Sequence, residues 1–167
     1  MATFGRTTFE LQAVSYPADT KIGSRFALVE AGDVTKLTAH FRLAHATAKV
    51  RGLIYAASGT EPAALVAVTN EKIGIPSNNI WVDLPLAAPV SLSAGNYFLC
   101  LHGNTALEGL GSNSGVGVNR FNTDTYADGA TNPFGAATSS SYERAIYATY
   151  TATVAVTRRR PLVAFCG

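Results

Sequence analysis

The sequence has few charged residues. Only 14% of its 167 residues are Asp, Glu, Lys or Arg, whereas a monomeric surface usually carries about a quarter to a third. A chain with so few charged residues cannot cover its whole surface with charge, so we expect part of its surface to be buried against other chains. The net charge is only +2, far from the basic balance of a protein that binds by neutralising phosphates. We therefore expect no nucleic-acid partner.

Long hydrophobic runs are also lacking. No run approaches the ~20 apolar residues that a membrane-spanning helix needs, and the first residues do not lead into the apolar core of a signal peptide. We therefore expect no membrane partner, and a mature chain that begins at or next to Met1 in the cytoplasm where it is made. With 47% hydrophobic residues the chain is too apolar for disorder, and its length suits one domain.

Cysteine is scarce, because Cys100 and Cys166 are the only two in the sequence. A domain of this size buries enough surface to fold without a disulfide. Cys100 lies in an apolar run, where we expect a buried free thiol. A bridge between the two cysteines, or between neighbouring chains, is the alternative.

Signatures of catalysis are missing. The sequence contains neither the Gly-x-Ser-x-Gly turn of a nucleophilic serine nor a phosphate-binding loop ending in Gly-Lys-Ser or Gly-Lys-Thr. Its histidines, His40, His45 and His102, show no metal-ligand spacing with the cysteines. His40 falls on the polar side of an expected strand, so we expect a histidine at the surface or rim. We predict no catalytic residues, no cofactor and no enzyme.

One stretch has a superficial likeness to a calcium loop. Asp124 and Asp128 are spaced like the first ligands of such a loop. Tyr126 occupies the ligand position between them, however, and Gly135 stands where a bidentate glutamate should close the loop. We expect no metal, and Asp124 and Asp128 are only weak candidates for ligands. The simpler interpretation is a turn whose side chains cap backbone amides.

What the sequence does have is alternation of period two. Between residues 36 and 43, Leu37, Ala39, Phe41 and Leu43 are apolar and the residues between them are polar, which predicts a strand with one buried face. Turn-forming clusters separate most of the similar runs, and 61–72 is better explained by a turn and a strand than by a helix. These further strands are expected at 9–14, 22–30, 50–57, 64–69, 72–75, 80–84, 96–102, 116–121 and 142–156.

The spacing of these runs predicts an all-β fold. We expect an antiparallel, jelly-roll-like β-sandwich of about 8–10 strands over residues 1–156. Residues 103–115 and 122–141 are rich in Gly, Asn and Ser, so we expect two long loops where a ligand could bind.

Residues 157–167 predict an extended C-terminal arm. A basic triplet is followed there by an apolar tail, which suits an anchor on the surface of a neighbouring protein. No aromatic residues interleave with the triplet, which argues against a nucleic-acid contact. The expected partner-binding residues are Arg158, Arg159, Arg160, Leu162, Val163 and Phe165.

Three stretches resemble a β-sandwich module of structural proteins in tailed bacteriophages and of some bacterial surface proteins. They span about residues 20–151, and the third is the most distinctive. The first is VRGLIYA (50–56) with SGTEPAAL (58–65), the second WVDLPL (81–86) with APVSLSAGNYFLCLH (88–102), and the third NTDTYADG (122–129) with NPFGAA (132–137) and IYATYT (146–151).

The resemblance implies a sandwich without catalytic activity that serves as a decoration, tail or adhesion module. We therefore expect a structural virion protein of a tailed phage, bound to the major capsid protein or to other virion proteins. The leading expectation is a decoration or cement protein that bridges capsid subunits as a homo-oligomer, with a trimer as one arrangement, and a tail component comes second. The virion is the expected location.

The alternative function is a carbohydrate-binding or host-adhesion module with a glycan partner. Trp81 is the only tryptophan, and it could be a sugar-stacking platform or simply a core or edge aromatic. The loops would supply hydrogen bonds to the sugar. The candidate ligand-binding residues are Trp81, Asn122 and Tyr126.

Overall fold

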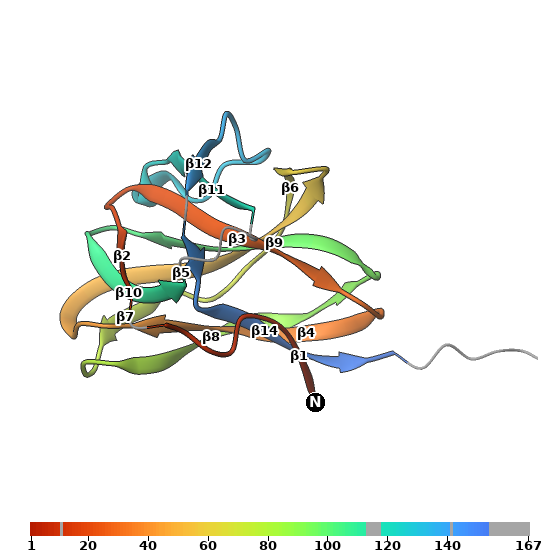
Figure 1. The fold of residues 1–167 in the computed structure, drawn as a ribbon, viewed down its shortest axis with the longest axis horizontal. Coiled ribbons are helices and arrows are strands. Elements are labelled where there is room, and N and C mark those ends of the chain that lie inside the picture. Colours follow the sequence, from red (N-terminus) through yellow and green to blue (C-terminus); the bar gives the residue numbers. More distant parts are fainter. Residues whose placement is uncertain (11, 113–117, 141, 154–167) are drawn as a thin grey trace, which may run out of the picture.

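Strands dominate the structure. The computed structural model describes residues 1–10, 12–112, 118–140 and 142–153. These residues form two antiparallel sheets that pack face to face as a β-sandwich, which confirms the predicted fold class (Figure 1). Within these described ranges one 3-10 turn, η1 (Tyr126–Asp128), interrupts the strands. No described residues form a helix long and apolar enough to cross a membrane.

Sheet A, the lower sheet in Figure 1, has β4 near its middle, between β14 and β8. β1 pairs with the outer edge of β14, and β2 and β13 pair with β10. The strands of sheet A are β1 (Ala2–Gly5), β2 (Gln12–Tyr16), β4 (Gly32–Phe41), β8 (Ile80–Leu92), β10 (Leu107–Ser112), β13 (Glu143–Arg144) and β14 (Ile146–Ala152).

Sheet B has the order β12-β11-β3-β9-β5-β6, and β7 pairs with β5. Its centre is the run β3-β9-β5, in which each strand is hydrogen-bonded on both sides. The strands of sheet B are β3 (Thr20–Leu28), β5 (His45–Ser58), β6 (Glu61–Val68), β7 (Lys72–Ile75), β9 (Gly95–Gly103), β11 (Asn119–Thr123) and β12 (Thr138–Ser140).

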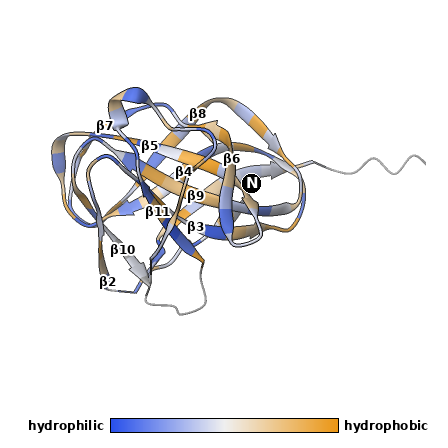
Figure 2. Cartoon of the chain, turned by 90° about the horizontal axis from the view of Figure 1, so that it is seen from above, coloured by the Kyte–Doolittle hydropathy of each residue, from blue (hydrophilic) through white to orange (hydrophobic). Residues whose placement is uncertain are grey.

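The main core lies between the two sheets. As the alternation predicts, Leu37, Ala39 and Phe41 of β4 point into it and are fully buried. Leu43 is not part of it, because β4 ends at Phe41 and the Leu43 side chain is 44% exposed. Figure 2 shows hydrophobic residues along the central strands of the sheets.

The expected exposure of His40 is wrong. His40 does lie on the outer face of sheet A, but only 1% of it is exposed. The ring of Phe9, from the segment between β1 and β2, lies with its centroid 4.2 Å from the imidazole and covers it. Trp81, the cross-strand neighbour of His40 on β8, closes another side at 5.2 Å. Alternation along one strand gives no sign of a cover from a distant segment.

A second, smaller core lies on the outer face of sheet B. Leu53 and Tyr55 of β5 and Phe98 and Cys100 of β9 are buried there against Phe134. Phe134 belongs to residues 124–137, which cross this face and which we call the cap. Cys100 is a free, fully buried thiol, as expected, whereas Cys166 lies outside the described residues.

Of the two expected loops, only the second has largely irregular structure. Residues 107–112 of the first form β10, which pairs with β2, so the prediction of a loop is wrong there. The glycines that suggested a loop have a packing role. A Cβ atom at Gly109 would collide with the Tyr16 ring, and one at Gly111 would crowd the Glu143 carbonyl. The other short strands, β1, β12 and β13, raise the strand number above the expected 8–10.

Substituting Gly23 tests how tightly sheet B packs. A Cβ atom at Gly23→Ala would collide with the Leu99 carbonyl oxygen and the Cys100 sulfur, so we expect the free energy of unfolding to fall by about 1–3 kcal/mol. Gly95→Ala is the control, because the atom nearest to its added Cβ lies 3.8 Å away. Its effect on the free energy of unfolding should stay within about 0.5 kcal/mol. Urea denaturation measures both, and equal effects would contradict this packing.

Candidate functional site

The cap is held to sheet B by a buried lysine. Lys21 of β3 is fully buried, and its Nζ lies 3.0 Å from Oδ2 of Asp124. The ammonium also donates hydrogen bonds to the Phe134 carbonyl, at 2.9 Å, and to the Thr131 hydroxyl. The Phe134 ring lies 4.6 Å from Nζ. A buried charge requires this degree of pairing, so Lys21 fixes where the cap closes.

The Asp124 carboxylate is used in contacts within the fold and is not free to bind a metal ion. Its Oδ2 accepts the Thr131 N–H at 2.9 Å in addition to the Lys21 contact. Burial acts to raise the pKa of the Asp124 carboxyl, but the Thr131 N–H and the Lys21 ammonium outweigh it and lower the pKa. Asp128 is exposed at the end of η1. The described residues contain no group of three or more His, Cys, Asp or Glu that could hold a metal.

Asn122 is one of the candidate ligand-binding residues, and its side chain fastens the cap. Its Nδ2 donates to the carbonyl oxygens of Phe134 and Ala136, at 3.1 and 2.7 Å. Asn132 fastens the cap in a similar way, because its Oδ1 accepts the Leu65 N–H of β6 at 3.0 Å.

Tyr126, the second candidate, is 4% exposed and lies between two neighbours. The centroids of the His102 and Tyr126 rings are 5.0 Å apart. The guanidinium of Arg51, on β5, lies 4.5 Å from the centroid of the Tyr126 ring. Its hydroxyl donates to Oε2 of Glu71 at 3.0 Å. With its ring packed between His102 and Arg51, Tyr126 is poorly placed as a stacking platform for a ligand.

His102 links η1 to sheet B. It is fully buried, and its Nε2 lies 2.7 Å from the Asp124 carbonyl oxygen, a hydrogen bond that Nε2–H donates in the neutral ring. Burial lowers the pKa of His102, and the Asp124 carbonyl opposes this only in part. A neutral His102 is therefore favoured at neutral pH, which suits a structural contact.

Trp81 lies on the outer face of sheet A, on the opposite side of the sandwich from the cap. It is partly buried in an aromatic cluster whose other members are Phe9, His40 and Tyr147. The ring centroids of Trp81 and Tyr147 are 5.3 Å apart. We call this cluster the aromatic face. Because Asn122 and Tyr126 lie on the cap side, the three candidate ligand-binding residues do not form one site.

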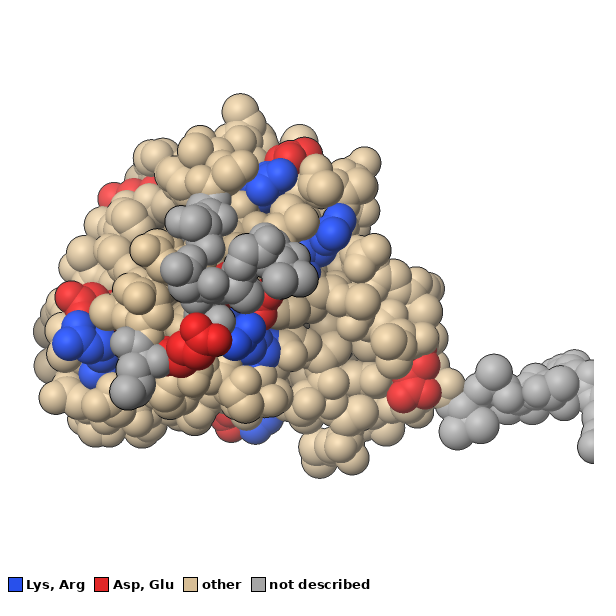
Figure 3. Space-filling model, in the orientation of Figure 1, with Lys and Arg blue, Asp and Glu red and all other residues tan. Residues whose placement is uncertain are grey.

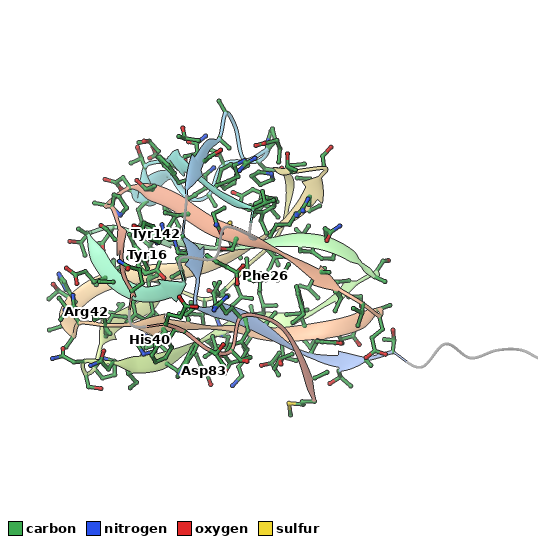
Figure 4. The ribbon with its side chains drawn as sticks, viewed as in Figure 1. Tyr16, Phe26, His40, Arg42, Asp83 and Tyr142 are labelled. Atoms are coloured by element: carbon green, nitrogen blue, oxygen red, sulfur yellow. The ribbon has the colours of Figure 1, made fainter. Side chains whose placement is uncertain are left out.

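Hydrogen-bonding groups border the aromatic face. Asp83, two residues after Trp81 on β8, has a side chain that is 54% exposed. Its carboxylate accepts hydrogen bonds from the Lys36 ammonium, at 2.5 Å, and the Thr38 hydroxyl, at 2.7 Å. Burial acts to raise the pKa of Asp83, but Lys36 and Thr38 outweigh it and lower the pKa. Figure 4 shows His40 and Asp83 on this lower side of the molecule.

The partner-binding residues expected in the C-terminal arm, Arg158 to Arg160 with Leu162, Val163 and Phe165, lie outside the described residues. Cys100 gives little support to nucleophilic chemistry, because burial raises the pKa of its thiol and no solvent reaches it. Sequence reasoning missed Lys21, since a lone lysine in a strand has no signal that reveals its burial.

The chain matches no protein-family model, no curated protein and no solved structure.

Removing the Lys21 charge should loosen the cap. Lys21→Met leaves Asp124 buried without its cation, so we expect the free energy of unfolding to fall by about 3–5 kcal/mol. The control is Lys36→Met, which breaks a solvent-exposed pair and should lower it by no more than about 1 kcal/mol. Urea denaturation gives both values.

Hydrogen exchange locates the effect. Amide hydrogen exchange should accelerate most in residues 124–137. If Lys21→Met proves too unstable to purify, Asp124→Asn, which keeps the side-chain shape, is the variant to measure. Uniform acceleration over both sheets, with no preference for the cap, would contradict the role assigned to Lys21.

Proposed function

We propose that the protein is a non-enzymatic structural component of a tailed-phage virion, in the first instance a capsid decoration or cement protein. The observation that carries the proposal is the small amount of free charge on the surface. Lys36, Arg42 and Arg120 are each paired with a carboxylate, and much of the face in Figure 3 carries no charge at all. Burying such a surface against another protein costs little free energy, because few charged side chains are desolvated.

The resemblance of the third stretch supports the same proposal. Its Asp124, Asn132 and Phe134 close the cap on sheet B, through Lys21, Leu65 and the small core. These three residues of the third stretch therefore hold the cap to sheet B. A module built around them is suited to attachment rather than to chemistry.

Two features could provide attachment. β1 has a strand partner on one side only among the described residues, so its other edge offers backbone groups for strand addition. β8 also lies at an edge, but Pro85 and Pro89 lack the N–H groups that a further strand would need. The second feature is the basic and apolar sequence of residues 157–167. Apolar burial by Leu162, Val163 and Phe165 would add to the contact of the arginines.

Truncation tests this proposal. We expect the full chain to bind purified phage heads and a chain that ends at Val156 to lose most of that binding, as measured by light scattering. A full-length variant with Arg158, Arg159 and Arg160 replaced by Gln separates the basic triplet from the apolar tail. A protein that stays monomeric and does not bind phage heads, with or without residues 157–167, would rule out the capsid role. It would favour a role in the phage tail or in glycan binding.

A second candidate function is carbohydrate binding, and the aromatic face favours it. Partly exposed rings next to an exposed carboxylate and an ammonium provide both stacking and hydrogen bonds for a sugar. Trp81 supplies the largest ring, and Asp83 and Lys36 are the polar partners. The sites of Asn122 and Tyr126 are not needed for this role.

A glycan array on the wild type and on Trp81→Ala tests the second function. We expect the wild type to bind at least one neutral saccharide and Trp81→Ala to lose at least about tenfold in affinity, because stacking on the indole is removed. Ile73→Ala removes an exposed apolar side chain of β7, away from the aromatic face, and serves as the control. An array without hits, or equal binding by Trp81→Ala, would count against it.

A further inference from the structure

A polar pocket of about 490 Å³ opens where the cap begins, at one end of sheet B. Five segments that are far apart in the sequence line it: the β2–β3 turn, β5, the β6–β7 turn, the β9–β10 turn and η1. Its size falls within the range of sites that hold small ligands. The side chains that matter here are Asp19, Lys49, Arg51, Glu71, Asn104 and Tyr126.

The cations of the pocket share one carboxylate. Lys49 Nζ lies 3.4 Å from Oε1 of Glu71, and a terminal nitrogen of Arg51 lies 3.2 Å from Oε2. The Tyr126 hydroxyl donates to that same Oε2. The hydrogen bond from Tyr126, followed by the charges of Lys49 and Arg51, lowers the pKa of Glu71 and so keeps it ionised.

The remaining walls are held by backbone contacts. Asn104 Oδ1 accepts the Lys49 backbone N–H at 2.8 Å, and the Asn104 N–H donates to the Lys49 carbonyl at 3.1 Å. Asp19 Oδ1 accepts the Tyr126 N–H at 2.8 Å. Asn104 and Asp19 are therefore held in place before any ligand arrives, which reduces the ordering that binding requires.

Donors outnumber acceptors in this pocket. Glu71 is the only carboxylate among the described residues that pairs with Lys49 or Arg51, so most N–H groups of both cations have no protein acceptor. The Asn104 amide nitrogen adds two more donors, since only its oxygen is engaged. The chief open acceptor is Oδ2 of Asp19. Two cations and two carboxylates, Asp19 and Glu71, line the pocket, so its formal charge is balanced. The open donors of Lys49 and Arg51 suit an anionic group at their end of the pocket, and the Asn104 amide and Asp19 oxygen suit hydroxyls.

We propose that this pocket binds a sugar carrying a carboxylate, such as a uronic or sialic acid. The sugar carboxylate would accept charge-assisted hydrogen bonds from Lys49 and Arg51. The sugar hydroxyls would meet the Asn104 amide and the free oxygen of Asp19. The proposal concerns the cap side of the sandwich and depends neither on attachment to a virion nor on the aromatic face.

Calorimetric titration of the full chain with glucuronate, N-acetylneuraminate, glucose and inorganic phosphate tests it. At least one acidic sugar should bind more tightly than glucose and phosphate. Lys49→Gln should weaken that binding by at least about tenfold, because it removes a charge-assisted contact. Lys49→Arg should retain most of it. The matched control, Arg42→Gln, neutralises a paired cation at the end of β4, with a side chain as exposed as that of Lys49, and should leave binding unchanged.

Equal affinity for glucose and the acidic sugars, no binding of either acid, or no effect of Lys49→Gln would overturn the proposal. Phosphate that binds as tightly as the acids would also overturn it, since it would show a simple anion site. Trp81→Ala serves to separate the two sites: it should leave the affinity for the acidic sugar unchanged, and a loss there would move the binding to the aromatic face.

Discussion

The arrangement of the cap side follows from one buried ammonium group. Lys21 is a charge within an apolar environment, and such a group is stable only when its donors are satisfied. The oxygen atoms that satisfy it come from Asp124, Thr131 and Phe134, all in the cap. Closing the cap turns the outer face of sheet B into interior, so β5 and β9 carry buried apolar side chains on both faces. The Lys21 contact thereby also places η1 and the wall of the charged pocket.

The alternation of apolar and polar residues was enough to predict the antiparallel sandwich and the central strand β4. It was not enough for His40, because the side chain that covers it, Phe9, belongs to a segment that lies 31 positions earlier in the sequence. Nor was it enough for β10, where glycine is required by the Tyr16 ring rather than by a turn. Composition records how often a residue occurs, whereas these outcomes depend on what lies opposite it.

The candidate sites show the same limit. Trp81 could be chosen from the sequence as a rare aromatic, and the structure does place it at the surface of sheet A among other rings. Asn122 and Tyr126 could be singled out as polar loop residues, but their side chains are used within the fold. The pocket at Lys49 and Arg51 has no motif, since five separate segments form it. Spatial convergence of this kind leaves no local pattern in the sequence.

The pairing of β1 with β14 has a consequence for the order of events during synthesis. Ala2 lies opposite Tyr150, and β14 in turn forms one side of β4, so β1 and a strand made more than a hundred residues after it share one sheet. A ribosome that releases the chain from its N-terminus leaves β1 and one edge of β4 without partners until β14 emerges. Long-range pairing of this kind is slow to form and exposes strand edges meanwhile. Nascent chains that crowd together on one messenger RNA would therefore aggregate through these edges more readily than those of a helical domain of equal length.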